Sequence, residues 1–254
     1  MIEPTRDCCR LTYLQQRSTM SRYTYLVTGA NRGIGFEIAR QLLAEGSHDV
    51  IAVVRSIGTA GPIKALVDEN KNSKIVEFDV TDRFSIKGAV KALKAKGVAK
   101  VDVLINNAGV AHELVPIEAL EDSEFERILR TNVVGPNAVI SEFLPLLQQG
   151  TRKVVVNISS GLGSISMNSG YTSGGYNVSK AALNMLTKQY AVEMASSGFT
   201  FIALDPGWVQ TDMGGKGAPL LANESVSAIV ATLSKLTTKD NGKYMNRFGK
   251  TLPF

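Results

Sequence analysis

Short apolar runs alternate with amphipathic stretches along most of the chain, and this alternation restricts the fold more than any other feature. The apolar runs lie at 23–28, 50–54, 74–78, 101–105, 154–158 and 200–204, with a short one near Lys243. Helical periodicity fills the stretches between them, at 34–45, 61–70, 83–97, 124–149, 177–196 and 224–236. Apolar strands separated by helices are typical of a parallel sheet buried between two helical layers. The order predicts an α/β protein with a single doubly wound Rossmann domain and a parallel sheet of about seven strands.

Residues 1–22 precede this alternation and have no clear period, so we expect an extension without fixed structure before the Rossmann domain at 23–254. Cys8 and Cys9 are adjacent in that extension, which argues against a disulfide framework. With His48 and His112 as the two histidines, no metal site is expected. No apolar run is long enough to span a membrane and no secretory signal is visible, so we expect a cytoplasmic protein without a membrane partner.

The formal net charge of +5 raises the question of a nucleic-acid partner. The basic residues are interleaved with acidic ones and form no block, which is typical of a solvated surface. We therefore expect no nucleic-acid partner.

A glycine-rich segment joins the first apolar run to the first helix. Its sequence is Thr28-Gly29-Ala30-Asn31-Arg32-Gly33-Ile34-Gly35. Glycines at such a turn let the pyrophosphate of a dinucleotide approach the backbone and the helix N-terminus. An ordinary strand-to-helix turn is the alternative. Because the segment follows a predicted strand and opens a predicted helix, we expect a dinucleotide site.

Two arginines indicate which dinucleotide would bind there. An NAD-binding chain usually has a carboxylate at the end of the second strand, but this strand ends in Arg55, and Arg32 lies inside the glycine turn. Guanidinium groups suit a ribose 2′-phosphate, so we infer NADPH as the cofactor. The alternative is that either arginine points into water.

Polar or small residues also follow the third and fourth strands. Asp79, followed by Val80, is placed to accept a hydrogen bond from an adenine amino group, or else to cap the next helix, as Thr81 or Asp82 would. Asn106, Ala108 and Gly109 follow the fourth strand, where small residues permit close packing against a cofactor; an ordinary turn is the alternative.

The residues Tyr176 and Lys180 open the helix after the fifth strand. Side chains four residues apart share one helical face, so the phenol and the ammonium can share one site. A nearby lysine charge favours the phenolate, so we expect it to lower the pKa of Tyr176 from its usual value near ~10. Tyr176 would then exchange a proton with a carbonyl or alcohol oxygen.

Together these motifs resemble the short-chain dehydrogenase/reductase family, from Tyr23 to near the C-terminus. The resemblance rests on Thr28 to Gly35, Asp79, Asn106 to Gly109, Asn132, Ser159-Ser160, Tyr176 with Lys180, and Pro206-Gly207. The segment 206–215 and the ending Leu252-Pro253-Phe254 are similar to C-factor and sniffer-type carbonyl reductases and to fungal polyketide ketoreductases.

The resemblance implies a role for each matching residue. Asn132 would hold a water that relays protons to Lys180, and Ser160, with Ser159 as the alternative, would bind the substrate oxygen. Lys180 would also bind the nicotinamide ribose. The implied cofactor contacts are Gly29, Asn31, Arg32, Gly33, Ile34, Gly35, Arg55, Asp79, Val80, Asn106, Ala108, Gly109, Tyr176, Lys180, Pro206, Gly207, Val209 and Thr211.

Three further side chains lie near the predicted site. We expect His112 to be a surface-loop residue and Tyr171 a loop or packing residue, whereas Trp208 either lines the pocket or belongs to the core. A short flap is expected at about 212–223.

The expected function is NADPH-dependent reduction of a small-molecule ketone or aldehyde, by a homodimer or homotetramer as the resemblance implies. Two alternatives remain open: a catalytically silent NADP-binding regulatory protein, and a non-redox epimerase or dehydratase that uses the same site.

Overall fold

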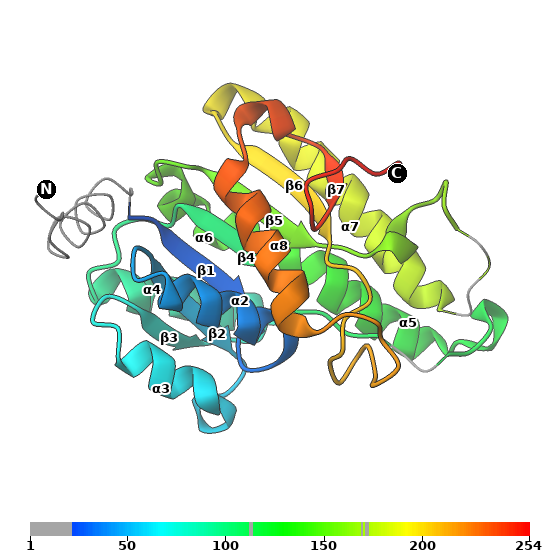
Figure 1. The fold of residues 1–254 in the computed structure, drawn as a ribbon, viewed down its shortest axis with the longest axis horizontal. Coiled ribbons are helices and arrows are strands. Elements are labelled where there is room, and N and C mark those ends of the chain that lie inside the picture. The colour runs from blue at the N-terminus through cyan, green and yellow to red at the C-terminus, as the bar shows by residue number, and fades with distance from the viewer. Residues whose placement is uncertain (1–21, 112–113, 169, 171–172) are drawn as a thin grey trace, which may run out of the picture.

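The computed structural model of the 254-residue chain describes residues 22–111, 114–168, 170 and 173–254. Seven strands form one parallel sheet in the order β3-β2-β1-β4-β5-β6-β7 (Figure 1). The strands are β1 (Thr24–Thr28), β2 (Asp49–Val54), β3 (Lys74–Glu77), β4 (Val103–Asn106), β5 (Val154–Ile158), β6 (Thr200–Asp205) and β7 (Tyr244–Asn246). This topology confirms the predicted doubly wound Rossmann domain.

Helices cover both faces of the sheet. The α-helices are α2 (Gly33–Ala44), α3 (Pro62–Asp68), α4 (Arg83–Ala95), α5 (Asp122–Leu129), α6 (Gly135–Gln148), α7 (Gly174–Glu193) and α8 (Ala222–Lys235). The short 3₁₀ turns are η1 (Ile57–Thr59), η2 (Ile117–Ala119), η4 (Gly161–Gly163), η5 (Ala195–Ser197) and η6 (Thr238–Asp240). Ile38 of α2, Ile63 of α3 and Ile229 of α8 share one buried cluster with the sheet. Ile86 of α4 and Phe143 of α6 belong to the cluster on the other face.

The sheet order changes direction between β1 and β4, because β2 lies on one side of β1 and β4 on the other. In sheets of this kind the usual ligand position is at the carboxyl ends of the two strands that flank such a change. The glycine turn follows β1, and Asn106 ends β4, so the predicted cofactor residues gather at these strand ends.

The predicted helix at 124–149 is divided into three parts. A π-helical segment, η3 (Arg130–Val134), separates α5 from α6. The break precedes Pro136, whose ring nitrogen cannot donate the hydrogen bond that an α-helix would direct to the Asn132 carbonyl. Pro145 stays inside α6. The helix ends at Gln148, three residues after Pro145.

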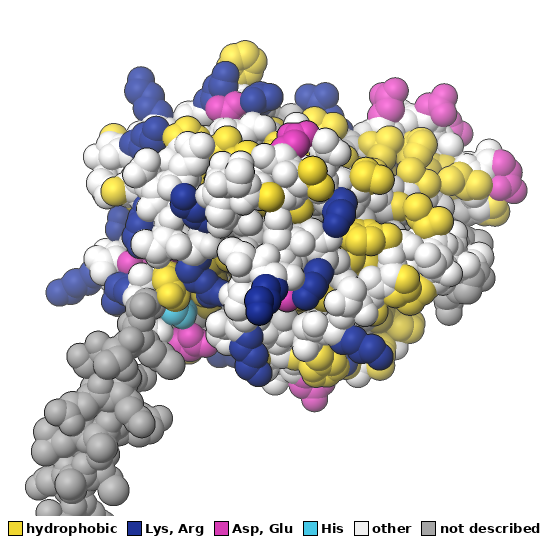
Figure 2. Space-filling view, turned by 90° about the horizontal axis from the view of Figure 1, so that it is seen from above, with side chains coloured by type: hydrophobic (Ala, Val, Ile, Leu, Met, Phe, Trp, Pro, Cys, Tyr) yellow, Lys and Arg dark blue, Asp and Glu magenta, His cyan; other side chains and the backbone are white. Residues whose placement is uncertain are grey.

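Three further expectations concern the N-terminal extension, membrane-spanning helices and the distribution of surface charge. Residues 1–21 lie outside the described residues, so the unstructured extension stays a prediction; Arg22 pairs with Asp49. Among the described residues, no helix is long and apolar enough to cross a membrane. On the face shown in Figure 2, Lys and Arg side chains are dispersed, while hydrophobic ones gather toward the right-hand end, where α5 lies in Figure 1.

Candidate active site

The glycine turn brings β1, β4 and α2 into close backbone contact. Gly29 and Gly33 have φ values of +67° and +58°, a region that favours glycine. A Cβ on Gly35 would lie 2.3 Å from Asn107 Nδ2 and 2.4 Å from the Gly29 carbonyl oxygen. Gly35 therefore lets α2 pack closely against the end of β1 and the loop after β4. The backbone of this turn lies at the start of α2, a position that suits the pyrophosphate of a dinucleotide.

Asn107 supports this turn, a role that was not predicted for it. Its Nδ2 donates to the carbonyl oxygens of Thr28 and Gly29, at 2.9 and 3.3 Å. In return, Thr28 Oγ1 accepts the backbone N–H groups of Asn107 and Ala108. The second asparagine after a buried strand was the available signal, because a buried amide there needs backbone partners.

The two arginines that predict NADPH both follow strand ends, Arg32 after β1 and Arg55 after β2. Arg32 precedes α2, and its Nη1 lies 2.5 Å from Asp212 Oδ2, with both side chains largely exposed. Arg55 is exposed just after β2. Glu77 ends the neighbouring β3, and its Oε2 accepts the N–H of Ile57. Asn31, Gly33 and Ile34 are half-buried at the turn.

The end of β3 distinguishes the two interpretations of Asp79. Asp82 caps α4, since its Oδ1 accepts the N–H groups of Phe84 and Ser85. Asp79 Oδ1 instead accepts the N–H and the hydroxyl of Thr81, at 2.8 and 2.7 Å. The N-cap alternative for Asp79 is therefore wrong. The Val80 side chain is buried against Gly135.

The Asn106 side chain is buried in the protein and does not face the cofactor site. It is 3% exposed, and its Nδ2 donates to Asn157 Oδ1 of β5 at 2.9 Å. Asn157 Nδ2 then donates to Thr187 Oγ1 of α7 at 2.8 Å. The Asn106 side chain faces the core beneath α7, which leaves its backbone as the part a cofactor could contact.

The two serines after β5 have separate environments. Ser159 is 2% exposed, and its hydroxyl donates to Asn184 Oδ1 at 2.7 Å. Ser160 Oγ accepts the N–H of Leu162 at 3.2 Å, so its own proton remains available to donate. A hydrogen bond with Ser160 lowers the pKa of Tyr176, as expected when the serine donates to the phenolic oxygen. The geometry therefore joins Tyr176 with Ser160 and assigns Ser159 to the core.

Lys180 lies behind the phenol. Its Nζ is 5.5 Å from the centroid of the Tyr176 ring and donates to the Ile158 carbonyl oxygen at 2.8 Å. An ideal Cβ on Gly109 would lie 3.7 Å from this Nζ and 3.3 Å from Asn132 Oδ1. The loop after β4 thus packs directly on Lys180 and Asn132.

The expected lowering of the Tyr176 pKa by Lys180 is wrong for this structure. Burial raises the pKa of Tyr176 to about 12, against the hydrogen bond with Ser160, and the charge of Asp205 raises it further. Burial also lowers the pKa of Lys180 to about 8. For Tyr176, desolvation outweighs the hydrogen bond with Ser160 because the phenol is enclosed. The phenol consequently carries its proton at neutral pH.

Asn132 lies in the π-helical segment and is 1% exposed. Its Nδ2 donates to the Val110 carbonyl oxygen at 2.8 Å and to Ser179 Oγ at 3.0 Å, while its Oδ1 accepts the Val110 N–H at 2.9 Å. The side chain therefore holds the loop after β4 against α7. The Asn132 carbonyl lacks the α-helical donor that Pro136 cannot provide.

The loop after β6 closes over the glycine turn. Pro206 and Gly207 start it, with φ +79° at Gly207, and Val209 is buried. Thr211 Cγ2 lies 3.4 Å from an ideal Cβ on Gly33, which places Thr211 above the cofactor turn.

The expected flap is internally hydrogen-bonded. The Trp208 indole donates to the Gly214 carbonyl oxygen at 2.8 Å, and Gln210 pairs with Ala218 and Leu220. Trp208 is 61% exposed, so it is not a core residue.

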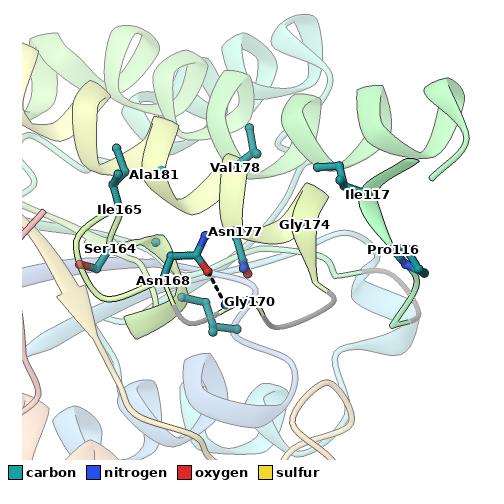
Figure 3. Close-up of a pocket in the computed structure, with 12 residues that line it drawn as sticks. Pro116, Ile117, Ser164, Ile165, Asn168, Gly170, Gly174, Asn177, Val178 and Ala181 are labelled. Atoms are coloured by element: carbon teal, nitrogen blue, oxygen red, sulfur yellow. Dashed lines mark hydrogen bonds between the residues drawn. The ribbon is translucent and has the colours of Figure 1, made fainter. Parts of the chain in front are cut away.

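A separate hollow of about 400 Å³ lies beside this site (Figure 3). It is lined by Pro116, Ile117, Leu162, Gly163, Ser164, Ile165, Asn168, Gly170, Gly174, Asn177, Val178 and Ala181. The four α7 residues in this set lie on a different helical face from Tyr176 and Lys180.

Two predicted features lie outside what the structure tests. His112 and Tyr171 are outside the described residues. Within the described part of the chain, no group of three or more His, Cys, Asp or Glu side chains is arranged to hold a metal ion.

Comparisons with known proteins agree with this geometry. Residues 23–219 match the short chain dehydrogenase family. The C-signal protein of Myxococcus xanthus is 36% identical over 154 residues, covering 61% of this chain and 93% of that protein. The NADPH-bound carbonyl reductase from chicken fatty liver has a TM-score of 0.86 and 33% identity, covering 92% of this chain and 100% of that one. The carbonyl reductase Sniffer of D. melanogaster has a TM-score of 0.86 and 32% identity over the same shares.

These similarities confirm the resemblance inferred from the motifs, including its C-factor and sniffer-type branch. The match spans the glycine turn, both serines and the pair Tyr176 and Lys180, which the structure brings to one end of the sheet. The chain belongs to the short-chain dehydrogenase/reductase family of oxidoreductases.

Proposed function

We propose that the protein is an NADPH-dependent carbonyl reductase that converts a ketone or aldehyde to an alcohol, with Tyr176 as the proton donor. The observation that carries this proposal is the pairing of the Ser160 and Tyr176 hydroxyls beside the buried Lys180, at the strand ends next to the glycine turn. The similarity to carbonyl reductases, one of them crystallised with NADPH, supports it.

The cofactor would lie along the glycine turn. Gly29, Gly33 and Gly35 would admit its pyrophosphate, and Thr211 would cover it. Arg32 and Arg55 would bind the 2′-phosphate. NADPH, when bound, supplies the hydride. The residues in contact with the cofactor would be those implied by the family resemblance, and Asn106 would contact it through its backbone.

The chain's own residues would manage the substrate oxygen. The Ser160 hydroxyl, which donates to the Tyr176 oxygen in this structure, would donate to the substrate oxygen instead and stabilise the developing negative charge. Tyr176, protonated at neutral pH because its pKa is about 12, would transfer its proton to the same oxygen. Lys180 and a water held by the Asn132 carbonyl would restore the proton.

The direct test is Tyr176→Phe, assayed by NADPH oxidation over aldehydes, quinones and diketones. We expect turnover to fall about a thousandfold, in the range of general-acid contributions, with NADPH binding retained. The matched control is Tyr190→Phe, since the Tyr190 hydroxyl bonds Asn137 at 2.7 Å outside the site. Unchanged reduction by the Tyr176 variant would refute the proposal.

Two other results would favour the alternatives. Tight NADPH binding by the wild-type chain without any carbonyl-dependent oxidation would favour a regulatory binding protein. A product formed without net change in the cofactor would indicate an epimerase or dehydratase.

Cofactor choice has its own test. Replacing both Arg32 and Arg55 by alanine should weaken NADPH binding at least tenfold, because charge-assisted bonds to the phosphate are lost, while NADH binding stays nearly the same. A wild-type preference for NADH would contradict the arginine argument.

A further inference from the structure

The backbone of Ser160 is held by a tyrosine far away in the sequence. Tyr244 belongs to β7 at the edge of the sheet, is fully buried, and donates its hydroxyl to the Ser160 carbonyl oxygen at 2.6 Å. The same oxygen also accepts the N–H of Gly163 at 2.8 Å. Ser160 is therefore fixed from two sides, one of them another strand.

The segment after Tyr244 continues this support. The ring of Phe254 packs on the Tyr244 ring, with centroids 5.7 Å apart. The Ser164 hydroxyl donates to the Pro253 carbonyl oxygen at 2.8 Å, and Ser166 donates its hydroxyl and N–H to the Phe254 oxygen at 2.6 and 3.1 Å. Figure 1 shows this terminal segment (red) leaving β7 toward the loop that precedes α7.

The opposite side of the same loop rests on α7. An ideal Cβ on Gly163 would lie 2.8 Å from Lys180 Cβ, so the loop lies flush against the lysine. Residues 160–166 are thus clamped between α7 and the segment 244–254. A shift of Ser160 would need one of these two contacts to open.

We propose that Tyr244 is a positioning residue for Ser160, and that the segment 244–254 is part of the active-site architecture. This inference rests on the proposed carbonyl reductase function. Tyr244 holds the Ser160 carbonyl and the Leu162 N–H holds Ser160 Oγ, so the hydroxyl oxygen is fixed where its proton can reach Tyr176. Preorganised donors of this kind lose catalytic effect when displaced by a fraction of an ångström.

The test is a double-mutant cycle of Tyr244→Phe and Ser160→Ala. Tyr244→Phe removes one hydroxyl and leaves the Ser160 carbonyl its bond from Gly163, so the fold is retained. We expect kcat for carbonyl reduction to fall about tenfold in the wild-type background and less than twofold in the Ser160→Ala background, because Tyr244 acts through Ser160. The dissociation constant for NADPH should not change. Tyr190→Phe is the matched control and should leave kcat unaltered.

A readout that needs no turnover accompanies the kinetics. Hydrogen exchange of the backbone amides at 159–168 should be faster in Tyr244→Phe than in wild type and in Tyr190→Phe. If wild type shows no carbonyl reduction while this exchange still rises, the proposed function fails and the positioning of the loop stands. If wild type is active and Tyr244→Phe matches it in kcat, the inference is overturned.

A second variant tests the same inference if Tyr244→Phe folds poorly. Phe254 is 41% exposed, so Phe254→Ala should fold, and it removes the ring that supports Tyr244. We expect a two- to fivefold lower kcat, roughly half the logarithmic effect of Tyr244→Phe, that is again lost in the Ser160→Ala background. Equal losses in both backgrounds would mean that the segment acts independently of Ser160, against the proposal.

Discussion

Lys180 is a buried charge that should make the enzyme less stable than it would be without it. The side chain is 5% exposed, and burial lowers its pKa from 10.5 to about 8. That difference corresponds to a penalty of about 3 kcal/mol for the charged form at neutral pH. Lys180→Met removes the penalty and also the bond to Ile158, which offsets about 1 kcal/mol. We therefore expect the variant to be inactive and more stable by about 2 kcal/mol at pH 7.

The stability difference between wild type and Lys180→Met should depend on pH. Below pH 8 the lysine is charged in both states, and the penalty is complete. Between pH 8 and 10.5 the folded lysine loses its proton while the unfolded one retains it, so wild-type stability rises with pH in that window. The advantage of Lys180→Met should shrink accordingly between pH 7 and pH 10.

Urea unfolding of both proteins at several pH values measures this difference. Lys188→Met is the control, because Lys188 is exposed on the same helix, and its removal should change stability by less than about 0.5 kcal/mol. A Lys180→Met variant that is less stable than wild type at pH 7, or a difference independent of pH, would refute the reasoning.

Other positions give equally direct expectations. Asp205→Asn removes a charge that raises the pKa of Tyr176, so the alkaline limb of kcat/KM for reduction should move to lower pH; an unmoved limb would contradict this. Gly35→Ala should weaken NADPH binding at least tenfold, since its Cβ would lie 2.3 Å from Asn107 Nδ2. Gly88→Ala, in open space on α4, is its control in the same binding assay and should bind NADPH normally. Ser159→Ala should lower the free energy of unfolding by about 1–2 kcal/mol and keep turnover, because it loses the buried bond to Asn184. Ser160→Ala should lose turnover and keep its stability. The opposite pattern would exchange the roles of the two serines.

Periodicity was sufficient to predict the fold, because each buried strand is a short apolar run such as 154–158 and each helix carries an apolar stripe. Spacing alone placed Tyr176 and Lys180 on one helical face. The sign of the Tyr176 pKa shift was beyond reach, since it depends on how completely loops from other strands enclose the phenol. Tyr244 and Asn107 were missed for a similar reason: their partners are backbone oxygens, which leave no pattern in the sequence.

The asparagines of β4 and β5 have a consequence for folding accuracy. Asn106 and Asn157 stand opposite each other in the parallel ladder and share a hydrogen bond, and the pair before them on the same face is Leu104 and Val155. A slip of two residues would leave each amide opposite an aliphatic side chain, with unsatisfied groups that cost about 1–3 kcal/mol apiece. Uniformly apolar strands tolerate such slips far better. The amide pair therefore fixes the register of β5 against β4. With this register, Ser160 follows β5 at the same level as the loop that begins after β4.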